Sequence, residues 1–206
     1  MKKYIILAAV LLGLGVAQVS RAQSNLTAIS YEVSLPLSDT KNFTNKTSFI
    51  GFMFDTRRFV QPNTTVGVSL GLHVFDDKVN DEVLSLGDVF GNERNVDIWG
   101  TQYRYINSWP LMLNSFYYFG NRRSTVRPYL GTGVGAYIAR RRVDAGLSTF
   151  AETKWQFGFS PELGLLYEMG EMNLLLKATY NYGLKAGNAP ALSYVTFGLG
   201  FAWTGY

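Results

Sequence analysis

Large apolar side chains alternate with small or polar ones through most of the chain after residue 26. The final segment, TFGLGFAWTGY (196–206), shows the pattern clearly, because Phe197, Leu199, Phe201 and Trp203 are separated by Gly or Ala. Successive side chains of a β-strand point to opposite faces, so each such segment gathers its apolar groups on one face. The pattern predicts eight strands, at 27–37, 48–56, 64–74, 99–119, 126–139, 154–167, 173–183 and 196–206.

The segments between the predicted strands alternate in length. Short turns are expected near 60–63, 120–125 and 169–171, and longer polar segments near 38–46, 76–98, 141–153 and 185–192. An even number of antiparallel strands, with short turns at one end and long loops at the other, is typical of bacterial outer-membrane barrels. The predicted fold class is therefore all-β, a closed antiparallel up-and-down transmembrane β-barrel of eight strands. Both termini are then expected on the periplasmic, short-turn side.

The second face of these strands separates the barrel from its alternative, a soluble β-sandwich. In a sandwich the face opposite the core would carry long polar residues. Here that face is rich in Gly, Ala and Ser, which suits the narrow interior of a small barrel. The large apolar face is therefore predicted to contact lipid. Aromatic residues near the predicted strand ends fit the interfacial girdles of such barrels; they are Phe59, Phe119, Tyr167, Trp203, Tyr103, Trp155, Tyr182 and Tyr194.

The predicted interior positions also carry charges of both signs in nearly equal number. They are Glu32, Asp55, Arg57, Arg104, Arg127, Lys154, Glu162 and Lys177. Buried charges are costly unless they are paired, and the balance of signs allows pairing. We expect a lumen filled by ion pairs, in which Arg104 and Arg127 face Glu32 and Glu162.

The beginning of the chain has the pattern of an export signal. Two lysines precede an apolar run (5–16) that is too short to span a bilayer as a helix, and small residues follow at Ser20 and Ala22. A short buried helix is the alternative interpretation of this run. We expect a cleaved signal peptide at 1–22 and an outer-membrane barrel domain at 23–206.

Composition and charge narrow the possible partners only a little. The chain has no cysteine, which excludes disulfides and thiolate metal sites. Cleavage of the signal peptide would remove three positive charges and lower the formal charge from +4 to +1. The basic balance therefore does not indicate a nucleic-acid partner.

Two segments resemble a known family. The segment from Pro110 to Tyr137 is similar to the central hairpin of the eight-stranded outer-membrane β-barrel proteins, a group that includes the OmpX, OmpW and OmpA transmembrane barrels. The final strand resembles the assembly signal of that family at Thr196, Gly198, Phe201 and Trp203. The resemblance implies contact with outer-membrane lipid and lipopolysaccharide, and insertion by the barrel-assembly machinery. It leaves open whether Trp203 or the terminal Tyr206 is the recognised aromatic residue.

The only histidine is the strongest candidate for catalysis. His73 faces the predicted lumen and could act as a base in a lipid A-modifying barrel, but this chemistry needs a hydroxyl and a carboxylate within hydrogen-bond reach. Ser69, on the same face, lies roughly 13 Å away along the strand. The acidic residues after His73 lack EF-hand spacing. We therefore expect no enzyme activity, no cofactor and no metal site, and interpret His73 as a hydrogen-bonding residue near the rim.

Two outer segments are candidates for binding. Arg140, Arg141 and Arg142 end the fifth predicted strand at the external rim, where guanidinium groups could contact lipopolysaccharide phosphates. The alternative is a solvated loop base with one arginine paired to a nearby acid. The acidic segment 76–98 is expected to be the longest outer loop, either binding a partner or folding over the rim.

The sequence thus favours an integral outer-membrane barrel with a filled lumen and a structural or interaction role through its extracellular loops. An extracellular or envelope protein partner is compatible with that role. Two alternatives are a narrow porin-like channel for small or hydrophobic solutes and a lipid A-modifying enzyme.

Overall fold

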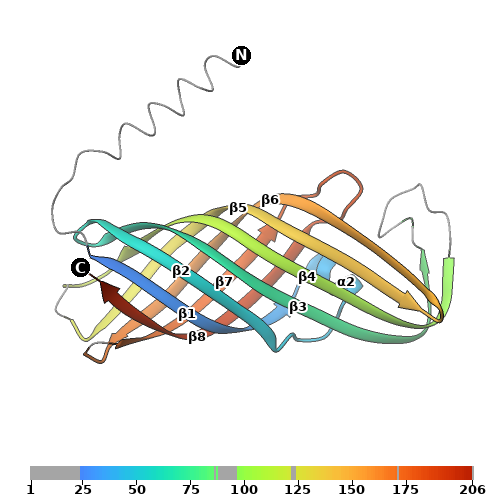
Figure 1. Cartoon of the computed structure of the whole chain (residues 1–206), viewed down its shortest axis with the longest axis horizontal. Helices are drawn as coiled ribbons and strands as arrows, with labels where there is room; N and C mark the ends of the chain where they lie inside the picture. Colours follow the sequence, from blue (N-terminus) through green and yellow to red (C-terminus); the bar gives the residue numbers. More distant parts are fainter. Residues whose placement is uncertain (1–23, 86, 88–96, 122–123, 171, 206) are drawn as a thin grey trace, which may run out of the picture.

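The computed structural model describes residues 24–205 except 86, 88–96, 122–123 and 171. In this part of the chain eight strands form a closed antiparallel barrel in sequence order (Figure 1). The strands are β1 (Asn25–Pro36), β2 (Ile50–Gln61), β3 (Thr64–Ser85), β4 (Asp97–Tyr118), β5 (Val126–Ala145), β6 (Ser148–Glu168), β7 (Met172–Gly183) and β8 (Leu192–Gly205). The predicted fold class is confirmed. The signal peptide expected at 1–22 lies outside the described residues.

The first and last strands close the barrel. β1 pairs with β8 without interruption from Asn25 opposite Gly205 to Pro36 opposite Tyr194. Closure satisfies the backbone N–H and C=O groups that a sheet edge would leave unpaired, which matters most in a hydrocarbon environment.

Two hairpins are much longer than the sequence pattern predicts. The segment 76–98, expected as a loop, continues β3 to Ser85 and begins β4 at Asp97, so that expectation is wrong for most of the segment. The expected loop at 141–153 is likewise strand, with its turn at Gly146 (φ 58°). Outside lipid a strand needs no continuous apolar face, so the alternation that marks strands is lost there.

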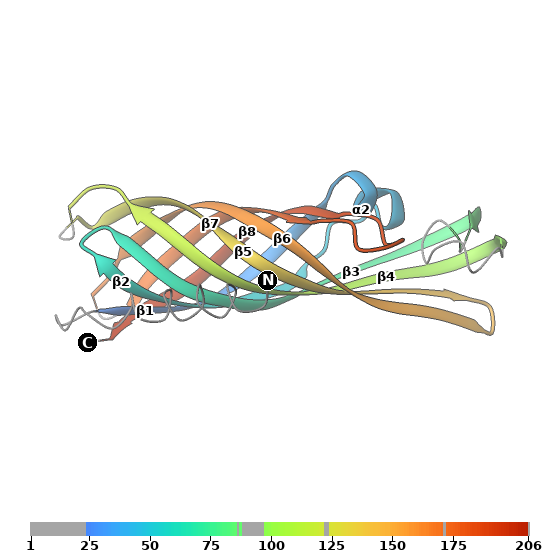
Figure 2. The same cartoon turned by 90° about the horizontal axis from the view of Figure 1, so that it is seen from above.

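The lengthened hairpins project together from one end of the barrel (Figure 2). β3 has 22 residues, whereas a tilted strand needs only about 9–11 to cross a bilayer. We call the projecting residues 76–85, 97–105 and 142–151, which end at one row of paired residues, the outer extension.

A short helix lies in the predicted outer segment 38–46. α2 (Ser38–Phe43) buries Phe43 among the lumen side chains, and Thr40 Oγ1 accepts a hydrogen bond of 2.8 Å from the Ser193 backbone N–H. The helix therefore packs against the barrel mouth and directs Phe43 into the lumen.

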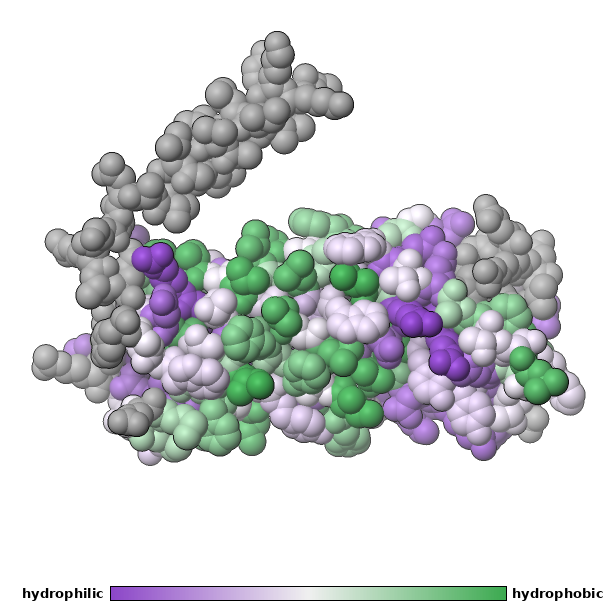
Figure 3. Space-filling model, in the orientation of Figure 1, coloured by the Kyte–Doolittle hydropathy of each residue, from purple (hydrophilic) through white to green (hydrophobic). Residues whose placement is uncertain are grey.

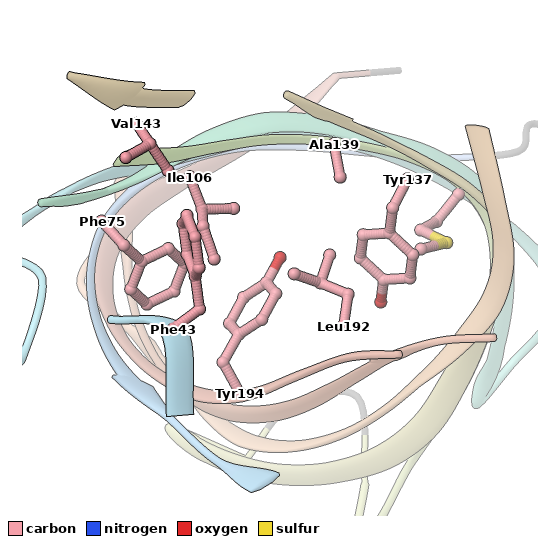
Figure 4. Close-up of a cluster of buried hydrophobic side chains, with 9 residues drawn as sticks. Phe43, Phe75, Ile106, Tyr137, Ala139, Val143, Leu192 and Tyr194 are labelled. Atoms are coloured by element: carbon pink, nitrogen blue, oxygen red, sulfur yellow. The ribbon is translucent and has the colours of Figure 1, made fainter. Parts of the chain in front are cut away.

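Two apolar clusters fill the ends of the lumen. The outer cluster surrounds Tyr194 and includes Phe43, Phe75, Ile106 and Leu192, which point toward one another inside the ring of strands (Figure 4). The inner cluster lies at the end with the short turns and comprises Leu26, Ala28, Phe59, Phe116, Tyr118, Tyr129, Leu166, Leu175 and Ala202.

The outside of the barrel is apolar across its middle. Leu113, Phe157 and Leu163 each expose 60–65% of their surface, and hydrophobic side chains form a band with hydrophilic residues at both ends (Figure 3). Among the described residues, no helix is long and apolar enough to cross a membrane. Phe59 and Tyr194, expected in the outer aromatic girdles, are buried in the lumen because they share the parity of Arg57 and Thr196.

Candidate functional site

A charged layer lies between the two clusters. It contains Glu32, Asp55, Arg57, Glu162 and Lys177, which we call the lumen network. The Lys177 ammonium is its centre, 2.7 Å from Glu32 Oε1, 3.0 Å from Asp55 Oδ2 and 3.9 Å from Glu162 Oε2. All five residues are at least 93% buried. Pairing therefore offsets the cost of holding these charges away from water.

Arg57 is the second cation of the network. Its Nη2 lies 2.9 Å from Glu162 Oε1 and 3.4 Å from Asp55 Oδ1. Its guanidinium carbon lies 3.8 Å from the centre of the Phe116 ring, and Nη1 donates to the Tyr118 hydroxyl at 3.1 Å. Arg57 thus ties the charged layer to the aromatic inner cluster.

Hydroxyl groups donate further hydrogen bonds to the carboxylates of the network. Tyr129 and Thr179 donate to the two oxygens of Glu162 at 2.8 and 3.1 Å. Ser69 donates to Asp55 Oδ1 at 2.5 Å and accepts a hydrogen bond from Asn114. The layer is therefore held by neutral donors as well as by ion pairs.

Small residues make room for the long charged side chains. A Cβ at Gly198 would lie 2.9 Å from Lys177 Cγ and 3.4 Å from Glu32 Cγ. This is the role that the small residues on the inner face were expected to have.

His73 extends the network toward the outer cluster. Its Nε2 lies 2.7 Å from Glu32 Oε2 and its Nδ1 lies 3.0 Å from the Tyr194 hydroxyl, which is 3.2 Å from Ser108 Oγ. Tyr194, expected in the outer aromatic girdle, belongs instead to these hydrogen bonds inside the lumen. Parity with Thr196 and Gly198 would have placed it inside. His73 is fully buried inside the lumen rather than near the rim, where it was expected, and its hydroxyl partner is a tyrosine.

Arg104 and Arg127 do not occupy the positions expected for them. Arg104 lies beyond the network, where its Nε and Nη2 donate to Gln102 Oε1 at 3.2 and 3.1 Å. Arg127 lies at the other end, with its guanidinium 5.0 Å from the Tyr118 ring centre. Glu32 and Glu162 pair with Lys177 and Arg57 instead. Parity identifies which side chains point inward, but not their height along the lumen.

The three rim arginines do not share a face. Arg141 points inward and donates to the Pro190 carbonyl at 3.0 Å, and its burial lowers its pKa to about 10. Arg140 and Arg142 point outward. Arg142 lies 2.7 Å from Asp144, and its hydrogen bond holds the pKa of that carboxyl below the ordinary value. Successive side chains of a strand point to opposite faces, so Arg141 must face away from Arg140 and Arg142.

The outward pair borders a small hollow at the base of the outer extension. The hollow has a volume of about 180 Å³ and is lined by Tyr105, Asn107, Arg140, Arg142 and Asp144. The next row toward the barrel is Trp109, Ile138 and Trp155, and Trp155 is 64% exposed. The arginines therefore stand just outside an apolar and aromatic row, at the level expected for lipid headgroups.

The residues of the expected assembly signal all lie in β8. Thr196 is buried in the lumen and Gly198 faces Lys177, while Phe201 and Trp203 are about 45% exposed on the outside. Among the described residues, no cluster of three or more acidic, His or Cys side chains is arranged to hold a metal ion.

Comparison with known proteins shows a similarity of fold. No family model and no curated protein matches the chain. Neisserial surface protein A matches with a TM-score of 0.51 and 12% identity, over 89% of this chain and 97% of that one. Ail of Yersinia pestis, solved with the heparin analogue sucrose octasulfate, has a TM-score of 0.48 and 12% identity, over 89% and 98%. The E. coli outer membrane protein W has a TM-score of 0.47 and 16% identity, over 90% and 99%.

The fold and the apolar outer band together define the class of integral outer-membrane β-barrel proteins. The family resemblance expected from the hairpin and the final strand is confirmed at the level of this fold.

Proposed function

We propose that this protein is a sealed outer-membrane barrel that anchors the outer extension as an interaction surface. The observation that carries the proposal is the lumen, in which the buried lumen network lies between the outer cluster and the inner cluster. Such a barrel holds the outer extension rigidly and does not let solutes pass through its lumen. The signal peptide, the periplasmic termini and insertion by the assembly machinery through β8 belong to the same proposal.

The outer extension has features of a surface that contacts a protein. Val83 and Trp99 are paired across β3 and β4 and are 64% and 76% exposed, and Leu147 is fully exposed at the other hairpin tip. Exposed aromatic and aliphatic side chains on a rigid base are common anchors of interfaces. These features support an extracellular or envelope protein partner.

The sealed lumen makes a prediction for ion conductance. Protein refolded into a planar bilayer is expected to show no discrete conductance steps above the lipid background, because the buried ion pairs of the network lie across the lumen between the two clusters. Single-channel recording tests this, with heat-denatured protein as the blank. Steps in the unmodified protein that change size in Glu162→Gln would show that ions cross the lumen, and would favour the porin-like alternative.

We also propose that the rim hollow contacts phosphate groups of lipopolysaccharide. Two outward guanidinium groups stand beside Asn107 and Tyr105 at the headgroup level, and guanidinium binds phosphate in a bidentate manner. The Arg142 side chain is exposed even though it pairs with Asp144, so a phosphate can compete with Asp144 for its guanidinium group.

Neutralising both outward arginines is therefore expected to weaken lipopolysaccharide binding. Arg140→Gln with Arg142→Gln should raise the Kd in detergent by about tenfold, which corresponds to ~1.4 kcal/mol. Lys185→Gln, which removes an exposed cation between β7 and β8, is the matched control and should change little. Equal affinity of the double variant, or unchanged affinity for dephosphorylated lipopolysaccharide in the unmodified protein, would contradict the proposal.

We propose no enzyme activity for this chain. Its only histidine is fully buried between Tyr194 and Glu32, where an acyl or phosphoryl substrate from the membrane has no access. Lipid A mass spectra that change with expression of the protein and revert in His73→Ala would contradict this.

A further inference from the structure

A recess interrupts the apolar outer wall across β5 to β8. It has a volume of about 620 Å³, within the range of about 300–1,000 Å³ typical of small-molecule sites. Leu130, Leu163, Leu165, Leu176, Ala178 and Phe197 line most of it. The outer extension does not include this surface.

The strand register explains why the wall is hollow there. Leu130 on β5, Leu163 on β6, Ala178 on β7 and Phe197 on β8 form one outward row, because each is paired with the next. Three of these side chains are large and Ala178 is a single methyl. The recess is therefore a gap at Ala178 between taller neighbours.

The location and lining of the recess decide what can occupy it. Phe119 and Pro128, at its edge, flank the predicted periplasmic turn 120–125, so the recess lies within the apolar band on the short-turn side. Among the residues that line it, Lys177 is the charged one, and its ammonium lies in the lumen, held by Glu32 and Asp55. The recess thus offers apolar contact and no partner for a charge. A hydrocarbon chain of the bilayer fits this chemistry.

The backbone pairing is also incomplete beside the recess. The β6–β7 register passes from Phe159 opposite Tyr182 to Glu162 opposite Thr179. Of the two β6 residues between them, Ser160 and Pro161, the proline has no N–H to donate. From the lumen side, the Tyr137 hydroxyl lies 3.3 Å from the Phe159 carbonyl and 3.1 Å from Asn181 Oδ1. Side-chain hydrogen bonds from the lumen side therefore support the β6–β7 pairing next to the recess.

We propose that this recess is a binding site for one acyl chain of a phospholipid in the periplasmic leaflet. The bound chain packs on Ala178 between Leu163 and Phe197. This site is independent of the proposed interaction role, although it rests on the membrane location of the barrel.

Native mass spectrometry of the refolded protein tests the proposal. The probe is palmitoyl-oleoyl phosphatidylethanolamine in mild detergent. The unmodified protein is expected to retain one lipid, and Ala178→Leu, which fills the recess, should reduce the retained fraction by about tenfold. Ala136→Leu is the matched control, because Ala136 is another small outward residue that lies between Leu111 and Phe157, away from the recess. It should retain lipid like the unmodified protein, and a heat-dependent gel shift confirms that each variant is folded.

Photocrosslinking gives a second test that needs no substitution. Phosphatidylethanolamine with a diazirine in one acyl chain should label peptides from β6, β7 and β8 far more than those from β2 and β3. Labelling spread evenly around the barrel, or equal lipid retention in Ala178→Leu, would overturn the proposal. Dimers that dissociate in Ala178→Leu would also overturn it, since the recess would then be an interface between two copies. None of these outcomes affects the conductance test of the sealed lumen.

Discussion

Replacing Lys177 with methionine is expected to lower the free energy of unfolding by about 3–5 kcal/mol, the usual cost of removing one partner from a buried ion pair. The substitution keeps most of the side-chain volume but leaves Glu32 and Asp55 without the cation that lies within 3.0 Å of both. Glu162 also loses a cation at 3.9 Å. Urea unfolding in lipid vesicles, followed by tryptophan fluorescence, measures the change.

Lys154→Met is the matched control for this experiment. Lys154 also forms an ion pair, with Glu152 at 2.7 Å, but both side chains are about one-third exposed. Its loss should cost less than about 1 kcal/mol. Adding Asp55→Asn to Lys177→Met should recover part of the loss, because one uncompensated charge is then removed. Equal effects of Lys177→Met and Lys154→Met would show that the network contributes no more than a surface pair.

The second large effect is expected at Gly67. Alanine there would overlap the Thr56 carbonyl oxygen and lie 2.8 Å from Arg57 Cα, and both are backbone atoms of the paired strand. Because the backbone of a closed barrel has little freedom to shift, overpacking should cost about 3 kcal/mol, at the upper end of its usual range. The folded fraction, measured by the heat-dependent gel shift after refolding, should fall.

Gly205→Ala provides the comparison. A Cβ at Gly205 meets no atom within 4 Å, so the same change of residue type should leave refolding unchanged. A Gly67→Ala variant that folds as well as Gly205→Ala would contradict the close approach of β2 and β3 at this position.

The alternation of apolar residues was sufficient to predict the barrel because lipid imposes it on the spanning part of each strand. The same rule explains why the predicted strands of these hairpins are shorter than the observed ones. In the outer extension both faces of a strand can meet water or protein, so Asp77, Lys78 and Asn80 lie in β3 without an alternating pattern. The sequence pattern therefore ends β3 and β5 and begins β6 near the membrane surface, although it predicts nearly the whole of β4.

The charged lumen was predictable in composition but not in pairing. Parity identifies Glu32, Asp55, Arg57, Glu162 and Lys177 as inward residues. Which carboxylate meets which cation depends on the stagger of strands around the barrel, which no single strand specifies. The sequence therefore did not reveal that Lys177, rather than Arg104 or Arg127, is the cation at the centre of the lumen network.

The lumen network also has a consequence for the order of assembly. Its residues come from β1, β2, β6 and β7, and Lys177 reaches Glu32 across β8, so both ends of the chain must meet before the network is complete. Until the barrel closes, these charges need water. Expulsion of water from the interior and joining of β1 to β8 are therefore one event. A chain in which β1 and β8 have not yet paired should have a hydrated, charged cleft, and this cleft should disfavour its transfer into the hydrocarbon layer. Stable insertion into the membrane should therefore coincide with closure of the barrel.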